Sequence, residues 1–470
     1  MHLRRDAGIV VVAALFIGVA PGVSRAQSPA DSYYNFLMGR HLEMDGNVAG
    51  ALAALDRAAA ADPRSAEVRA EIASLQLRRN MRDEAEKAAK AALALDANNA
   101  EANSVLGRLY ANAAANEKNT RTQTETYVRD SIRHLERATA GASGPPDPTL
   151  NYTLGRMYTA SGQPQKGIEA LERVIAQSPF SVQARLALAQ AYASANDFAG
   201  AIETLDPVAD DSPVALEEMA KYQMGAGRNK EAVATYTRGL QAQPNNRRLK
   251  VQRIIAAYED KQYQQAATYA AEAQRQHQDD PNFPRLQASA LMKAGETPRA
   301  IALLETSART FPRDGEIQFM LASLYKEAGR DADSERMLRQ MLNADPANHR
   351  VLNYLGYLLA QDGRELDEAI RLVQRALQAE PGRAEYLDSL GWAHFKRGDF
   401  AEAEKYLTEA ARKLPDHPEI LDHLGDLYAS RGRWQDAIAA WTRALEGGED
   451  GIEPAVVRKK IDDARSRVAR

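Results

Sequence analysis

The sequence predicts an all-α solenoid of about twelve helix-turn-helix units closed by a C-terminal helix. Three observations predict it. Small residues recur at one position of the helical pattern along most of the 470-residue chain, most often 34 residues apart. Glycine and proline interrupt the apolar pattern at regular places. Aromatic residues are only 6% of the chain while alanine is abundant, a balance that favours close-packed helices over sheets. A solenoid grows along one axis, because each unit packs only on its neighbours.

The first 26 residues predict a secretory signal. Arg4 and Arg5 precede an apolar run over 9–20, and the segment closes on Ser24 and Ala26, with small residues at the positions that determine cleavage. The run holds about a dozen apolar residues, fewer than the ~20 that span a bilayer. We expect cleavage after Ala26 and an exported chain with no later transmembrane segment. The alternative is an uncleaved membrane anchor.

The repeat register follows from small residues near the start of each unit's second helix. Seven of the eleven gaps between successive anchors equal 34 residues, and the anchors are Ala51, Ala85, Ser131, Gly167, Ala201, Ala232, Ala266, Ala300, Ser334, Ala369, Ala403 and Ala437. Leucine–glycine pairs recur in the first helices, at 106–107, 154–155, 355–356, 390–391 and 424–425. Glycine lets two helices approach closely, and proline after a second helix ends it. One unit cannot bury its apolar face alone, so neighbouring units must stack.

This pattern resembles the tetratricopeptide-repeat (TPR) family over residues 32 to 451. The resemblance implies a right-handed superhelix in which the first helices line a concave groove. Repeats one to three are expected over 32–140, with an insertion at 112–127 in the third, and repeats four to twelve over 148–451. The connection over 141–148 is rich in glycine and proline, and it reads as a surface loop or a weak hinge.

Residues 452–470 are predicted to form a capping helix. Its apolar side carries Val456, Val457, Ile461, Ala464 and Val468, and charges occupy the other side. A polar outer face at the end of a solenoid is required for solubility.

The register also predicts which side chains of repeats ten to twelve face the groove. We expect a partner-binding surface made of Asn353, Tyr354, Tyr357, Asp388, Ser389, Trp392, Phe395, Lys396, Asp422, His423 and Asp426. Aromatic residues on a polar surface are common interface anchors. The alternative is that these aromatics pack against neighbouring helices, as aromatic stripes at helical spacing commonly do.

Other functional classes find little support in the sequence. The net charge of −4 is unlike the basic stripe of a nucleic-acid binder. Catalytic motifs, a phosphate-binding loop and metal-ligand spacing are all missing, so we expect no enzyme, cofactor or metal. Asp422, His423 and Asp426 alone do not complete a metal-ligand set. Some TPR domains hold a peptide carboxylate with lysine, but the matching positions here are Phe36, Ala70, Ser104, Tyr152, Leu186 and Glu217.

The last three repeats carry related motifs, namely 352–357 (LNYLGY), 387–392 (LDSLGW) and 421–426 (LDHLGD). They resemble bacterial exported TPR proteins, including lipoprotein adaptors that deliver substrates to a periplasmic carboxyl-terminal processing protease. The chain has no cysteine for lipid attachment, which leaves tethering and the exact partner open. The resemblance implies a periplasmic scaffold or adaptor that binds proteins or peptides. The alternative is a structural component of a secretion, pilus or polysaccharide-export assembly, and self-association is compatible with either.

Overall fold

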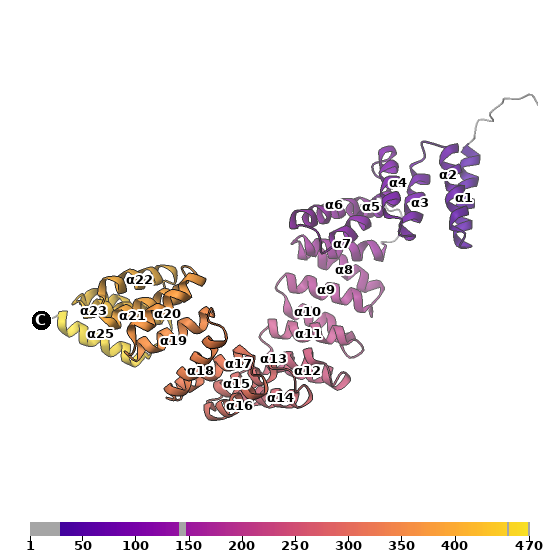
Figure 1. Ribbon diagram of the computed structural model, residues 1–470. Coiled ribbons are helices and arrows are strands. Elements are labelled where there is room, and N and C mark those ends of the chain that lie inside the picture. Colours follow the sequence, from indigo (N-terminus) through magenta and orange to yellow (C-terminus); the bar gives the residue numbers. More distant parts are fainter. Residues whose placement is uncertain (1–28, 141–146, 449–450, 469–470) are drawn as a thin grey trace, which may run out of the picture. The chain divides into compact units, whose positions relative to one another are not determined.

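The computed structural model describes residues 29–140, 147–448 and 451–468, and this part of the chain forms 25 α-helices without a β-strand (Figure 1). The helices follow one another in helix-turn-helix order, which confirms the predicted all-α repeat fold. The chain divides into two compact units, residues 1–235 and 236–470, and the boundary falls within α12 (Asn229–Ala242). Among the described residues, no helix is both long and apolar enough to cross a bilayer. The predicted signal over 1–26 lies outside the described residues.

Unit 1 is built of helix pairs in which the first five odd-numbered helices each pack on the even-numbered helix that follows. Its helices are α1 (Pro29–Met44), α2 (Val48–Ala61), α3 (Ala66–Arg78), α4 (Arg82–Leu95), α5 (Ala100–Ala114), α6 (Arg121–Ala140), α7 (Pro148–Ala160), α8 (Pro164–Gln177), α9 (Val182–Ser194), α10 (Phe198–Ala209) and α11 (Pro213–Gly225). Odd-numbered helices also contact the next odd-numbered helix, as α3 does with α5 and α7 with α9.

Local sequence explains where these helices begin and end. The tight turn after a first helix needs a left-handed residue, which is Gly46 (φ 77°) after α1 and Gly162 (φ 74°) after α7. First helices begin at capping side chains. Ser65 accepts a hydrogen bond from the Val68 amide at the start of α3, and Ser181 does the same at the start of α9.

Repeat three shows how close the helices approach. A Cβ added at Gly107 would lie 2.6 Å from the Leu135 side chain. The Ser131 hydroxyl, which is fully buried, donates to the Gly107 carbonyl at 2.7 Å. The small residues are therefore required by the helix contact itself. The extra residues of this repeat fall in the longer α6, which has 20 residues, and in the turn after α5.

Unit 2 continues the same pairing. After the boundary within α12 its helices are α13 (Arg247–Glu259), α14 (Tyr263–Gln276), α15 (Asn282–Lys293), α16 (Thr297–Thr310), α17 (Gly315–Glu327), α18 (Asp331–Ala344), α19 (His349–Gln361), α20 (Leu366–Ala379), α21 (Ala384–Arg397), α22 (Phe400–Lys413), α23 (Pro418–Ser430), α24 (Trp434–Gly447) and α25 (Pro454–Val468). A continuous core under α17 to α21 includes Leu338, Leu355 and Val373, each no more than 1% exposed.

The last helix, α25, packs on α24. Its buried stripe is Val457, Ile461 and Ala464. Val456 and Val468 were expected on the same apolar side, but they are 47% and 44% exposed. Helical geometry explains the exposure of Val456, because residues 457, 461 and 464 are spaced by four and three and share one face, while residue 456 is turned about 100° away from its neighbour. Val468 shares the buried face by its spacing, but it is the last residue of α25.

Candidate partner-binding site

We call the surface formed by the odd-numbered helices of unit 2 the first-helix face. The predicted binding residues all lie on three of these helices, α19, α21 and α23. Lys396 is exposed, and six residues are partly exposed: Asn353, Tyr354, Tyr357, Phe395, Asp422 and Asp426. Four are buried: Asp388, Ser389, Trp392 and His423. The structure thus brings the set together but divides it into an accessible rim and a buried layer.

An aromatic stack forms the centre of the buried layer. The Trp392 ring lies 4.0 Å from the His423 ring at an interplanar angle of 14°, and it stacks on Phe395 at 5.0 Å. Its indole N–H donates to Gln361 at 2.7 Å, and only 7% of the residue is exposed. Trp392 therefore packs between helices, as one of the two sequence interpretations had it. The Lys396 ammonium lies over the Trp392 ring, 5.3 Å from its centroid.

His423 forms a buried ion pair with Asp388. The His423 Nδ1 lies 3.0 Å from both Asp388 carboxylate oxygens, and the two residues are 5% and 4% exposed. Burial by itself lowers the pKa of His423, but the Asp388 carboxylate at hydrogen-bonding distance outweighs it, and Glu419 and Asp422 add to its effect. The pKa of His423 is therefore raised above its ordinary value.

A second, partly buried contact joins α19 to α23 across the intervening helix. The Tyr357 hydroxyl donates to the Glu419 carboxylate at 2.6 Å. Burial raises the pKa of Glu419 despite the opposing effects of His423 and of this hydrogen bond. Burial also raises the pKa of Tyr357, as does the neighbouring carboxylate. The contact fixes the Tyr357 ring at the edge of the rim.

Lys460 of α25 completes the network at the C-terminal end. Its ammonium lies 2.9 Å from Asp422 and 2.7 Å from Asp426. Burial and the neighbouring Asp422 raise the pKa of Asp426, while Lys460 opposes this effect. Burial lowers the pKa of Lys460, but the two carboxylates outweigh it and raise the pKa overall. Within the described residues, no group of three or more histidine and carboxylate side chains is arranged to hold a metal ion.

The first-helix face also contains a pocket that the sequence interpretation missed. Its volume is about 250 Å³, and four consecutive first helices, α13, α15, α17 and α19, line it with Tyr258, Ser289, Met292, Lys293, Phe319, Met320, Ser323 and Arg350. Phe319 lies 5.2 Å from Tyr354, so the pocket adjoins the rim. Tyr258 and Met292 are one 34-residue period apart, so the repeat register could have predicted this pocket. The prediction of groove residues covered only repeats ten to twelve.

Two cations on this face lack acidic partners. Neither Lys293 nor Lys396 has a carboxylate oxygen within 4.0 Å in the part of the chain that the structure describes. Arg350, in contrast, binds Glu316 at 2.7 Å. The apolar, methionine-containing pocket has Lys293 in its wall, and this combination can contact apolar and acidic side chains of another chain.

Unit 1 has a corresponding pocket of about 730 Å³ on its odd-numbered helices α7, α9 and α11. It is lined by Tyr152, Arg156, Gln183, Leu186, Ala187, Gln190, Val214, Glu218 and Tyr222. The Arg156 guanidinium stands 5.7 Å from the centroid of the Tyr152 ring. Tyr152 and Leu186 occupy positions at which some TPR domains carry the lysine that holds a peptide carboxylate. Here the two residues line a pocket together with other tyrosine and glutamine side chains. Such a surface can bind a peptide by apolar contacts and by side-chain amides.

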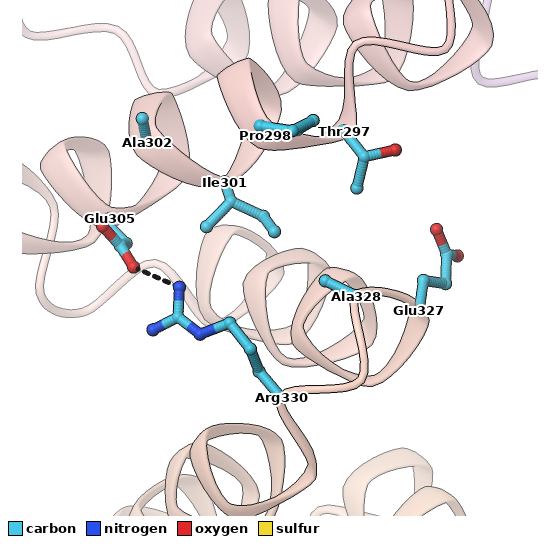
Figure 2. A pocket seen from close by; sticks show the side chains of 8 residues that line it. All are labelled: Thr297, Pro298, Ile301, Ala302, Glu305, Glu327, Ala328 and Arg330. Atoms are coloured by element: carbon cyan, nitrogen blue, oxygen red, sulfur yellow. Dashed lines mark hydrogen bonds and ion pairs between the residues drawn. The ribbon is translucent and has the colours of Figure 1, made fainter.

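A third pocket lies on another part of unit 2 (Figure 2). It has a volume of about 640 Å³ and is walled by α16, by the end of α17 and by the turn that follows. Its cation, Arg330, already binds Glu305 at 3.1 Å, as Figure 2 shows, and Asp333 at 2.7 Å. Although it is larger than the first-helix pocket, the cation in its lining is already paired with carboxylates, so it offers less to an acidic partner.

Comparison with known protein families identifies the family of this chain. Two tetratricopeptide-repeat profiles match the chain, one over residues 42–109, 131–221 and 291–361, and the other over 218–281 and 389–451. The chain belongs to the tetratricopeptide-repeat family. Members of this family generally act as scaffolds for protein–protein interaction.

Individual relatives are more distant. The TPR repeat-containing protein PA4667 of Pseudomonas aeruginosa is 30% identical over 132 residues, which are 28% of this chain and 22% of that protein. The aligned segment thus spans about a fifth of the curated relative. Among solved structures, yeast Tom70 has a TM-score of 0.43 at 12% identity over 93% of this chain and 96% of that one. Cut9 with Hcn1, from the APC/C, has a TM-score of 0.42 at 12% identity over 94% and 100%.

Proposed function

We propose that this protein is a non-catalytic scaffold or adaptor of the bacterial cell envelope that binds a partner protein or peptide on the first-helix face of unit 2. The observation that carries the proposal is the continuity of the accessible rim with the neighbouring pocket. Tyr354 and Phe319 join the two, and the unpaired Lys293 and Lys396 lie along the same face. The family's general role in protein interaction supports the same assignment.

The buried layer supports the rim in this proposal. Its four side chains, Asp388, Ser389, Trp392 and His423, lie behind the contact surface. They hold Tyr357, Phe395 and Lys396 in the positions from which these three residues contact the partner. Asn353, Tyr354, Asp422 and Asp426 complete the surface. A rigid base reduces the conformational entropy that is lost when a partner orders exposed side chains.

The partner segment proposed here carries apolar side chains flanked by carboxylates. Apolar groups would fill the pocket between Met292 and Met320, and carboxylates would pair with Lys293 and Lys396. The motifs of the last three repeats favour delivery of substrates to a periplasmic carboxyl-terminal processing protease. The second candidate, a structural part of an envelope assembly, differs because the protein would then co-sediment with membranes after cleavage of its signal.

Site-specific photo-crosslinking tests the surface. A photo-reactive amino acid is placed at Met320 or Lys396 on the first-helix face, and at Lys405 of α22 as a matched exposed control, since the Lys405 side chain is 58% exposed. The chain is expressed with its signal and irradiated in cells, and crosslinked partners are identified by mass spectrometry. The expected result is a shared partner at the first two positions that is missing at the control.

The charge reversal Lys396→Glu should then weaken capture of that partner about tenfold, while Lys405→Glu leaves it unchanged, because one desolvated ion pair contributes about 1.4 kcal/mol or more at an interface. Equal crosslinking at all three positions would rule out the first-helix face. A partner set that never contains a protease would remove the adaptor role, and a purely membrane-bound protein would favour the assembly component.

A further inference from the structure

Two arginines on neighbouring first helices of unit 1 have no acidic partner. Arg108 of α5 and Arg156 of α7 each follow the glycine at which their helix meets the second helix of its repeat, so they hold the same position of adjacent repeats. Within the residues that the structure describes, neither side chain forms an ion pair or a hydrogen bond. Lys221 of α11, in contrast, binds Glu218 at 2.5 Å.

The next first helix, α9, adds two side-chain amides to this surface. Gln183 and Gln190 are exposed, and in the described part of the chain neither side chain forms a hydrogen bond. Both line the pocket of about 730 Å³ in unit 1, together with Arg156. We call Arg108, Arg156, Gln183 and Gln190 the arginine patch. The fold does not use its polar groups, and side-chain amides can pair with the N–H and C=O of a peptide backbone.

The carboxylates around the arginine patch determine where an acidic partner can lie. Glu101 is in the first turn of α5, about 10 Å along the helix from Arg108. Glu217 and Glu218 of α11 share Lys221, at 3.8 and 2.5 Å. Among the described residues of this surface, the uncompensated positive charge thus belongs to α5 and α7, and the acidic part of a partner must lie over these two helices rather than over α11.

The spacing of the first helices matches an extended peptide. Helix α5 contacts α7, and α7 contacts α9, and packed helices lie about 8–10 Å apart. A polyproline II chain has three residues per turn and rises about 3.1 Å per residue, so every third side chain points the same way, about 9 Å from the last. Side chains at every third position would therefore meet α5, α7 and α9 in turn. On α9 they would meet Leu186, with the 59% exposed Val214 beyond it on α11.

We propose that the arginine patch binds an extended segment of another protein that carries two carboxylates three residues apart and an apolar residue three positions further on. The carboxylates pair with the guanidinium groups of Arg108 and Arg156. The apolar side chain packs on Leu186, and the two glutamine amides bind the backbone of the segment. The carboxylates belong to side chains, so an internal segment suffices and no chain terminus is needed. The apolar wall favours a peptide over a nucleic acid. This site is separate from the first-helix face of unit 2.

Fluorescence anisotropy with a synthetic peptide tests the site on the purified chain. The probe is a labelled, C-terminally amidated peptide of sequence Glu-Ser-Ser-Glu-Ser-Ser-Leu, and the control peptide has glutamine in place of both glutamates. At low salt, where exposed charges are least screened, the chain should bind the acidic peptide at least about tenfold more tightly than the glutamine peptide. A chain that binds the two peptides equally, or binds neither, would overturn the proposal.

Two double charge reversals separate the site from the net charge of the chain. One combines Arg108→Glu with Arg156→Glu. The matched control combines Arg137→Glu with Arg173→Glu, which changes the net charge equally at exposed positions of the second helices α6 and α8. All four side chains reach solvent, so both variants should keep the helical circular dichroism of the parent. The first variant should bind the acidic peptide at least about tenfold more weakly than the parent and the control less than about twofold. Equal losses would overturn the proposal, because net charge alone would then explain binding.

Further probes test the spacing and the class of partner. A peptide of the same composition with adjacent glutamates, Glu-Glu-Ser-Ser-Ser-Ser-Leu, should bind at least about threefold more weakly, because its two carboxylates cannot both approach the arginines. Equal binding would overturn the proposed spacing. Tighter binding of a single-stranded DNA of about ten nucleotides would overturn the choice of a peptide. Lys396→Glu in unit 2 should leave peptide binding unchanged, so this test does not depend on the partner proposed for unit 2. A loss on Lys396→Glu would show that the peptide binds elsewhere and would overturn the site.

Discussion

Replacing Asp388 by asparagine should destabilise the C-terminal repeats by an amount that depends on pH. The substitution keeps the shape of the side chain and one acceptor oxygen but removes the charge that faces His423. The pair is almost completely buried, with the His423 nitrogen 3.0 Å from both oxygens. A hydrogen bond to a charged group contributes about 1.5–3 kcal/mol. We therefore expect a loss of this size near pH 6, where the imidazole of the parent protein is protonated.

The sign of the pH dependence follows from the raised pKa of His423. The folded state holds this proton to a higher pH than the unfolded state, whose ordinary value is about 6.5. The stabilisation is thus fully present below about pH 6.5 and is lost as the pH rises through the folded pKa. One proton limits the slope to about 1.4 kcal/mol per pH unit. Asp388→Asn should flatten this slope, so that parent and variant converge at alkaline pH.

Other groups around His423 act in the same direction but at lower pH. The pKa values of Glu419 and Asp426 are also raised by burial, so their contributions to stability decline as the pH rises above about 4. Tyr357 and Asp422 complete the set of groups that face the imidazole. The part of the slope that Asp388→Asn removes is therefore the part that belongs to the pairing of His423 with Asp388.

Tryptophan emission is a suitable assay. The chain has three tryptophans, which are Trp392, Trp434 and Trp441, all in the last two repeats. Urea unfolding followed by this emission therefore reports on the repeats that contain the ion pair, even if other repeats unfold separately. Asp436→Asn is the matched control, because that carboxylate is 51% exposed and binds only Arg433. Its effect should stay within about 0.5 kcal/mol. Parent stability that is flat or rising from pH 6.5 to 8.5 would refute the reasoning.

Two further substitutions test the packing and the charge network. Gly425→Ala would place a Cβ 2.4 Å from the Trp441 indole nitrogen, so it should lower the unfolding free energy by about 1–3 kcal/mol. Gly315→Ala, with nothing within 4 Å of its Cβ, should leave the melting followed by circular dichroism unchanged or slightly raised. Lys460→Met removes the cation beside Asp426 and should cost about 1–3 kcal/mol at pH 7, and the loss should shrink towards pH 4, because the raised pKa of Asp426 lets this carboxylate gain its proton as the pH falls. A loss that grows towards acidic pH would contradict this reading.

Local spacing was enough to predict the repeats. A glycine that follows a leucine fits only where a neighbouring helix comes close, as Gly107 shows beside Leu135. Glycine after a first helix likewise marks a left-handed turn, as at Gly46. These features depend only on residues within one repeat. Repeats that are adjacent in the sequence are also adjacent in the structure. The helix pairs therefore follow from the period alone.

The division of the binding residues into rim and buried layer could not be predicted in this way. Tyr357 and Trp392 occupy the same position of adjacent repeats, yet Tyr357 is partly exposed and Trp392 is only 7% exposed. The difference arises from the next repeat, because His423 stacks on the tryptophan ring. Lys460 was missed for a related reason, since it belongs to the helix after the last repeat and has no place in the register.

The first-helix face has two parts, the rim around Trp392 and the pocket around Met292 and Met320, and we expect them to contribute differently to partner binding. Around Trp392, ion pairs and stacked rings leave each side chain one arrangement, so a partner meets a surface that is already formed. Around Met292 and Met320, the walls are flexible thioethers that can adapt to different apolar groups. Specificity should then lie at the rim and tolerance in the pocket. Met320→Leu should accordingly change partner affinity less than Lys396→Glu, and the reverse order would place the specific contacts in the pocket.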